Sequence, residues 1–184
     1  AADTPAGVTP WLNGKNVGGL IGVVTQHGSA AIQNSMAATV IRGTQSGGGL
    51  VGLAPGRTDL DTVYADCYIT APTTGGLIGS GGTGANITLK NFYAAGYQAA
   101  THMAAGVTPS AVVSAESGYS VCDYTLNHNT QCFSTAAACL GLVENVYYLI
   151  NDDVAFSAME QTRQVSYTEL SSRDFAAAHL NDAF

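Results

Sequence analysis

The sequence predicts an all-β protein of the β-solenoid type, in which short strands form coils that stack on one another. Three observations lead to this prediction: a glycine-rich string that recurs at a nearly fixed spacing, an apolar-aromatic phrase after each copy, and a content of 22 glycines in 184 residues. A fixed period of roughly 20–50 residues is typical of repeat architectures. A helical repeat would need long apolar stripes with few glycines, so the composition favours strands.

The recurring string has the form Gly-Gly-Leu-Ile/Val-Gly, and 30 residues separate its first two copies and 27 its last two. Glycine pairs suit corners between strands, because glycine allows a positive φ and lets another segment approach closely. The Leu-Ile/Val pair then supplies a short apolar strand, and the coils are expected to stack at a rise of about 4.8 Å. An ordinary β-sandwich with the strings as loops is the alternative. The motif residues are Gly18, Gly19, Leu20, Gly22, Gly48, Gly49, Leu50, Gly52, Gly75, Gly76, Leu77 and Gly79.

An apolar-aromatic phrase follows each string, at residues 32–37, 64–69 and 89–94, and a fourth phrase lies at 143–148. Strings and phrases together resemble the GLUG-motif repeats, named for their Gly-Leu-x-Gly core, which occur in secreted and cell-surface proteins of bacteria and archaea. The resemblance covers residues 14–97 well and 140–184 loosely. Met36 departs from it by replacing the aromatic residue, and 98–139 lack the string. The resemblance implies a β-solenoid at the cell surface and hardly constrains function.

The composition is poor in charge and acidic. Charged residues make up 10% of the chain, against about 25% in ordinary domains, and the net charge is −7. An acidic chain without a basic cluster argues against nucleic acid and anionic membranes as partners. No apolar run approaches the roughly 18 residues of a transmembrane segment. With few charges available to protect strand edges, we expect the protein to assemble with itself.

The chain is expected to form a single domain in four parts: an N-terminal arm at 1–17, three GLUG-like coils at 18–97, an irregular, cysteine-rich insertion at 98–142, and a last coil with a capping helix at 143–184. Trp11 is expected to cover the first coil, with an exposed ligand platform as the alternative. The conformation of the first part of the insertion stays open between a helix followed by a strand and an extended segment.

A short helix is predicted at about 172–181, because Ser171 and Asp174 form an approximate capping box there. It would act as the end unit that a solenoid needs to hide its last coil.

Four cysteines, an even number, fit an oxidising compartment, and the first residues, Ala1-Ala2-Asp3, fit a mature chain after removal of a signal peptide. We therefore expect an extracellular or cell-surface location. No Cys-x-x-Cys spacing for structural zinc is present, so disulfides are the favoured interpretation, although His128 would permit a metal site. The favoured pairs are Cys122–Cys132 and Cys67–Cys139, the second within one chain or between two chains.

No catalytic, cofactor or metal site is expected. The string from Gly79 to Gly84 matches Gly-x-Gly-x-x-Gly, but a strand-like segment follows it rather than the helix that a dinucleotide site needs. Asp59 and Asp61 are adjacent along the chain rather than opposed across a cleft, as glycoside hydrolysis requires.

Six tyrosines recur after the glycine strings and would form a ladder in a stack. The ladder is expected to pack between coils or, if exposed, to contact glycans or other subunits. The six are Tyr64, Tyr68, Tyr93, Tyr97, Tyr147 and Tyr148.

The function predicted from these features is that of a non-catalytic structural protein of the cell surface. It would self-assemble through strand edges into a fibre, sheath or envelope layer with disulfides and amyloid-like resistance. In composition and cysteine use the chain is similar to the tubular sheath proteins of methanogenic archaea. The alternatives are an adhesin or carbohydrate-binding solenoid, which would use the tyrosines with Asp59 and Asp61, and a polysaccharide-acting enzyme.

Overall fold

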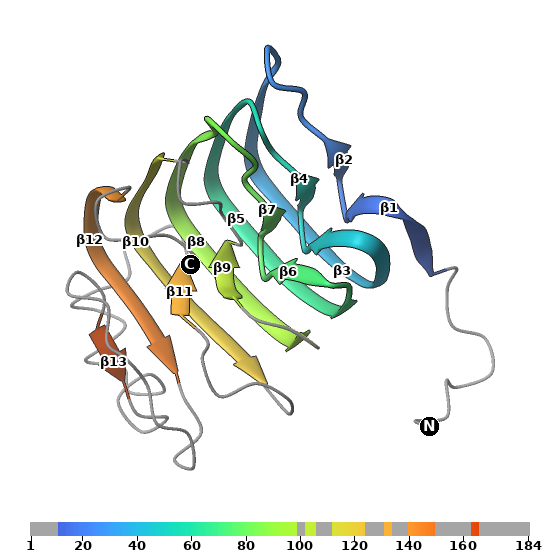
Figure 1. The fold of residues 1–184 in the computed structure, drawn as a ribbon. Helices are drawn as coiled ribbons and strands as arrows, with labels where there is room; N and C mark the ends of the chain where they lie inside the picture. The colour runs from blue at the N-terminus through green and yellow to red at the C-terminus, as the bar shows by residue number, and fades with distance from the viewer. Residues whose placement is uncertain are drawn as a thin grey trace.

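The computed structural model describes residues 11–98, 102–105, 112–123, 131–133, 140–149 and 163–165, and side chains within 11–96, 112–118 and at 165 (Figure 1). In these ranges every element is a strand, and every strand pairing is parallel. The strands form two sheets that stack coil on coil. The predicted all-β solenoid is therefore confirmed.

The larger sheet has the order β1-β3-β5-β8-β10-β12-β13, with β6 also paired to β3. The smaller sheet has the order β11-β9-β7-β4-β2. Figure 1 shows β1 and β2 at one end of the stack and β12 and β13 at the other. The larger sheet contains β1 (Leu12–Gly18), β3 (Ser29–Gly48), β5 (Arg57–Thr70), β6 (Thr73–Gly75), β8 (Asn86–Gln98), β10 (Val112–Asp123), β12 (Leu140–Leu149) and β13 (Arg163–Val165). The smaller sheet contains β2 (Ile21–Val23), β4 (Val51–Leu53), β7 (Ile78–Ser80), β9 (His102–Ala105) and β11 (Gln131–Phe133).

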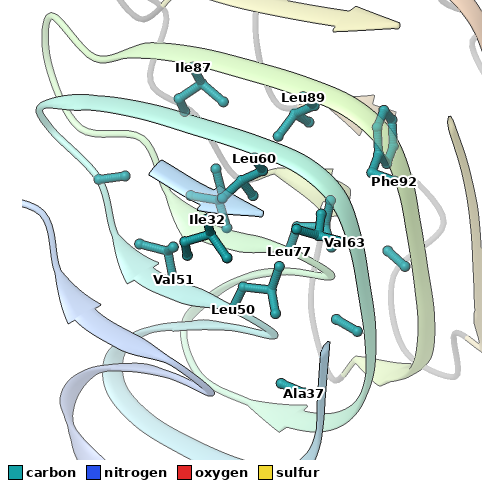
Figure 2. Packing of buried hydrophobic residues seen from close by; sticks show 14 of the residues in the cluster. Ile32, Ala37, Leu50, Val51, Leu60, Val63, Leu77, Ile87, Leu89 and Phe92 are labelled. Atoms are coloured by element: carbon teal, nitrogen blue, oxygen red, sulfur yellow. The ribbon is translucent and has the colours of Figure 1, made fainter. Parts of the chain in front are cut away.

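The core lies between the two sheets, as Figure 2 shows for Leu50, Leu77 and Phe92. It forms because side chains alternate between the two faces of a strand. In the second half of β5, Val63 and Ile69 point inward and are buried, whereas Tyr68 points outward. Because each coil repeats this pattern, apolar residues of successive coils pack directly on one another.

Strands β3, β5, β8 and β10 of the larger sheet each contain a bend at one residue with a left-handed backbone. These residues are Asn34 (φ 47°), Thr62 (φ 54°), Asn91 (φ 47°) and Ser117 (φ 53°). The residues on either side of them pair in register from coil to coil, so the bends stack into a column. In β5 the inward positions are Thr58 and Leu60 before the bend and Val63 after it. The bend therefore shifts the inward-outward alternation by one residue and keeps both halves of the strand on the core.

Residues 98–142, for which the sequence predicts an irregular insertion, contribute β9, β10 and β11. β10 continues the larger sheet, because it pairs with β8 over its whole length and with β12 from Val113 to Val121. This coil has no Gly-Gly-Leu string, which is why the sequence repeat does not indicate it. Most of the N-terminal arm and the helix predicted at about 172–181 lie outside the described residues.

Candidate functional site

The glycine strings form corners at which the chain leaves the larger sheet and enters the smaller one. A Cβ atom at Gly48 would overlap the carbonyl oxygen of Val51, and one at Gly49 would overlap that of Gly76 in the next coil. Among the described glycines, positive φ values occur at Gly82, Gly84 and Gly96, none of which belongs to a string. Of the two reasons for the glycine pairs, close approach of the backbone is therefore the one that applies.

The backbone hydrogen bonds at these corners all run in one direction along the stack. The N–H of Leu20 donates to the carbonyl of Leu50 at 3.0 Å, and the N–H of Leu50 donates to that of Leu77 at 2.9 Å. The same direction holds from Gly19 to Gly49 at 3.1 Å, from Val24 to Leu53 at 2.8 Å and from Ala54 to Ser80 at 2.7 Å. The N–H groups of each glycine corner thus donate to carbonyls of the next coil toward the C-terminus, and its carbonyls accept from N–H groups of the preceding coil.

Among the residues that the structure describes, the first coil forms one end of the stack, and part of its core is exposed. Leu20, Leu50 and Leu77 hold the same position in the repeat, yet Leu20 is 47% exposed whereas the other two are 0% exposed. The reason is that Leu50 and Leu77 have a coil on both sides, whereas no described residue covers Leu20 on its N-terminal side. Leu12 (37% exposed) and Val23 (45%) are also apolar and exposed on β1 and β2. We call these three residues the open coil end.

The open coil end carries little charge. Lys15 is the one charged residue of β1, and β2 has none. Trp11 contacts the first coil at its long strand: the guanidinium carbon of Arg42 on β3 lies 3.1 Å from the Trp11 ring centroid, a cation–π contact. In the described part of the chain, β1 and β2 pair only with β3 and β4, so each leaves one edge unpaired.

The tyrosine ladder lies on the outer face of the larger sheet. Tyr64 and Tyr93 are in register with Met36 on one side and with Tyr119 and Tyr147 on the other. Tyr119 is not among the six predicted ladder residues, although it follows Ser117 at the same spacing as Tyr93 follows Asn91.

The other three predicted tyrosines, Tyr68, Tyr97 and Tyr148, occupy other register positions. Tyr68 and Tyr97 pair with each other and form a second column. Tyr148 is in register with Ser120, which pairs with Ala94, so it lies one position beyond the register column of Tyr93, Tyr119 and Tyr147.

The ladder rings stack face to face. The rings of Tyr64 and Tyr93 are 4° from parallel with centroids 5.0 Å apart, so each ring covers one face of the other. The Tyr64 hydroxyl donates to the Asp66 carboxylate at 3.4 Å. Burial raises the pKa of Tyr64, and the negative charge of Asp66 beside it adds to the rise. The hydroxyl therefore stays protonated and donating at neutral pH.

The structure corrects one disulfide prediction. Cys67 is a free cysteine and is 1% exposed, and its thiol donates to the carbonyls of Ala37 at 3.5 Å and Gly49 at 3.8 Å. Burial raises the pKa of this thiol, so it is both inaccessible and unreactive. The predicted Cys67–Cys139 bridge is therefore absent. Cys139 and the side chains of Cys122 and Cys132 lie outside the described parts, so the second pairing stays a prediction.

The acidic pair sits on the outer face of β5. Asp59 forms an ion pair with Arg57 at 2.8 Å, and Asp61 accepts a hydrogen bond from the Asn91 side chain at 3.0 Å. In the next coils Lys90 pairs with Glu116 at 3.2 Å. These acidic residues form contacts within one strand, as Asp59 does, or between neighbouring coils, as Asp61 and Glu116 do. Among the residues whose side chains are described, no three His, Cys, Asp or Glu side chains form a group able to hold a metal ion.

Comparison with known proteins leaves the chain without a family assignment: no family model matches it, and neither a curated protein nor a solved structure is significantly similar. The GLUG resemblance therefore stays a prediction. The described residues include no helix with the length and hydrophobicity needed to cross a membrane.

Proposed function

We propose that the protein is a structural, non-catalytic building block that stacks end to end with copies of itself. The observation that carries this proposal is the exposure of Leu20 at a position where Leu50 and Leu77 are completely buried. A core cross-section open to water costs free energy, about 25 cal/mol for each Å² of apolar surface, and a further coil placed on it removes that cost. Repeat proteins need terminal units with a polar outer face to stay soluble for the same reason.

The direction of the hydrogen bonds selects the surface that fits the open coil end. At the first corner the carbonyls of Gly19, Leu20 and Val23 are the equivalents of those of Gly49, Leu50 and Leu53, which accept within the stack. At the opposite corner, where the chain returns to the larger sheet, the direction reverses: the N–H of Arg57 donates to the carbonyl of Gly28 at 3.2 Å. Because Ser29 is in register with Arg57, the N–H of Ser29 is the equivalent donor in the first coil.

Only a coil stacked in the same direction and register meets both corners correctly. The occupant is therefore the C-terminal end of a second copy, which requires that the helix predicted at about 172–181 leave the free edge of the last coil uncovered. Such a head-to-tail contact is heterologous and does not close, so repetition produces a filament.

We place this assembly at the cell surface, as the GLUG resemblance implies, in a fibre, sheath or envelope layer. Disulfides between copies would involve Cys122, Cys132 and Cys139, because Cys67 is buried within its own chain.

The test compares Leu20→Glu with Thr70→Glu in the full chain. Both add one negative charge at an exposed position, but Thr70 lies on the outer face of β5, away from the coil end. We expect filaments from the wild-type protein and from Thr70→Glu in electron microscopy, and particles of monomer mass from Leu20→Glu in analytical ultracentrifugation. Val23→Glu provides a second variant at the same end if Leu20→Glu lowers stability.

Two results would overturn the proposal. One is a monomeric wild-type protein both with and without strong reductant. The other is filament formation by folded Leu20→Glu and Val23→Glu at the wild-type rate. Filaments that dissociate only after reduction would support the proposal and add covalent bridges between copies.

A further inference from the structure

An open cleft with a volume of about 380 Å³, lined by both polar and apolar side chains, lies between the two sheets and spans three coils. One wall is a column of the larger sheet, in which Asn16, Ser46 and Thr73 are in register. The other wall comes from the smaller sheet, where Leu53 and Ser80 are in register. The cleft therefore runs along the stack, and its polar groups repeat at the coil spacing of about 4.8 Å.

The lining groups are neutral and both donate and accept hydrogen bonds. Ser46 is 3% exposed, and its hydroxyl donates to the Asn16 side-chain oxygen at 2.8 Å, which holds the amide in place. Thr73 and Ser80 add hydroxyls from the two walls, and Leu53 and Pro72 add apolar surface. Ligand sites commonly combine a concave shape with a few fixed polar groups in this way.

We propose that this cleft binds a neutral carbohydrate chain that lies along the solenoid axis. Short hydroxyl and amide side chains match the hydroxyls of sugar rings as donors and acceptors, and the apolar surface of Leu53 and Pro72 matches the C–H faces of the rings. A glycan lying along the axis would meet the polar column of Asn16, Ser46 and Thr73 on successive coils.

Other ligand classes fit the cleft less well. No lining residue is ionisable, so a phosphate, a nucleotide or a metal ion would be left without a charged partner. A peptide strand would need a free backbone edge, but Ser46 in the middle of the column is paired on both sides, with Asn16 and with Thr73, so among the described strands free edges remain only on β1 and β6 at the ends of the column.

The cleft is also a better glycan site than the tyrosine ladder, which the sequence suggests only as an alternative glycan contact. A flat aromatic platform must offer a ring face to the sugar, whereas Tyr64 and Tyr93 cover one face of each other.

The experiment is a titration with three neutral oligosaccharides: cellopentaose, chitopentaose and maltopentaose. Binding is monitored by ¹⁵N NMR on Leu20→Glu and by calorimetry on the wild-type protein. The calorimetry reports binding whether or not the protein assembles, and assembly is measured separately by microscopy. At least one sugar is expected to shift the amides of Asn16, Ser46 and Thr73 saturably, with a Kd in roughly the millimolar range. Salt at about 0.5 M is expected to leave the affinity unchanged, since no charge is involved.

The double variant Thr73→Ala/Ser80→Ala removes two lining hydroxyls and leaves the Asn16–Ser46 pair intact, so we expect at least a tenfold loss of affinity. The matched control, Thr70→Ala/Thr83→Ala, removes two hydroxyls from exposed residues outside the cleft and is expected to bind normally. The proposal is overturned if no sugar shifts the cleft amides up to roughly 20 mM, if the shifts centre on Tyr64 and Tyr93 instead, or if the control variant loses as much affinity as the cleft variant.

Discussion

Gly118 on β10 lies against the ring of Phe92 on β8, its register neighbour, and a Cβ atom at Gly118 would overlap that ring. Phe92 is completely buried, so the ring has no free space into which to move. The pair shows how two successive coils share one volume: the larger side chain of one coil occupies the space that the glycine of the next leaves free.

Gly118→Ala is expected to destabilise the protein by about 1–3 kcal/mol, because the added methyl group overpacks the Phe92 site. Phe92→Leu removes the overlapping ring edge, so the double variant should be more stable than the sum of the two single effects predicts. Urea denaturation of the four proteins measures this coupling. Simple additivity would mean that the two residues do not share this space.

The motif position held by Gly22 and Gly52 should respond differently in the two coils. A Cβ at Gly52 would lie 2.5 Å from the backbone nitrogen of Val17 and 2.7 Å from the carbonyl oxygen of Gly22, whereas one at Gly22 would lie 3.2 Å from the carbonyl oxygen of Asn16. Gly52→Ala must therefore move backbone and is expected to cost about 3 kcal/mol or more, against less than about 1 kcal/mol for Gly22→Ala. Thermal denaturation of both variants decides this, and equal losses would contradict the close-approach role of the motif glycines.

The bend column provides a stabilising substitution. Thr62 has a φ of 54°, which a β-branched residue tolerates poorly, whereas Asn34 and Asn91 hold the equivalent positions in the coils on either side. We expect Thr62→Asn to raise the free energy of unfolding by about 0.5–1 kcal/mol, despite the loss of the hydrogen bond from the Thr62 hydroxyl to Asp61 at 3.2 Å. Thr70→Asn, at an exposed strand position, is the control and should be neutral or destabilising because Asn is a poor strand former. The reverse ranking would show that the bend is not strained at Thr62.

Alkaline pH should destabilise the protein through Cys67. Its pKa in the folded state is raised above the usual 9.0, chiefly by burial, so the folded protein holds the proton more tightly than the unfolded chain does. Stability from this group is therefore complete below about pH 9 and is lost as the pH rises through the higher, folded pKa. Denaturation curves between about pH 7 and 11 should show the loss in the wild-type protein and a smaller loss in Cys67→Ala. Tyr64, whose pKa is also raised, contributes in the same direction from about pH 10 upward.

The buried thiol can also be checked directly. We expect Cys67 to resist thiol reagents in the native protein under non-reducing conditions and to react after unfolding in denaturant. Rapid reaction in the native state, or recovery of Cys67 in a disulfide by mass spectrometry, would contradict its burial as a free cysteine.

The sequence by itself determined the parallel, coil-on-coil architecture. The spacing of Gly18, Gly48 and Gly75 set the length of the coil, and each Leu that follows the glycine pairs marked a repeat position that is buried wherever a coil lies on both sides. This was possible because a repeated steric requirement, backbone against backbone at each corner, leaves the same residues in every coil.

Only the tertiary structure decided which residues share a face, an end or a cleft. The coil of β10 carries no glycine string, and its place in the stack became apparent only from its pairing with β8 and β12. Whether Tyr119 or Tyr148 joins the ladder depends on register, because one residue more or less moves a side chain to the other face of a strand. The left-handed bend residue in each of β3, β5, β8 and β10 makes that one-residue shift, and no local pattern reveals it. The free Cys67 and the cleft around Ser46 arise in the same way, since both depend on contacts between residues about one coil apart in the chain.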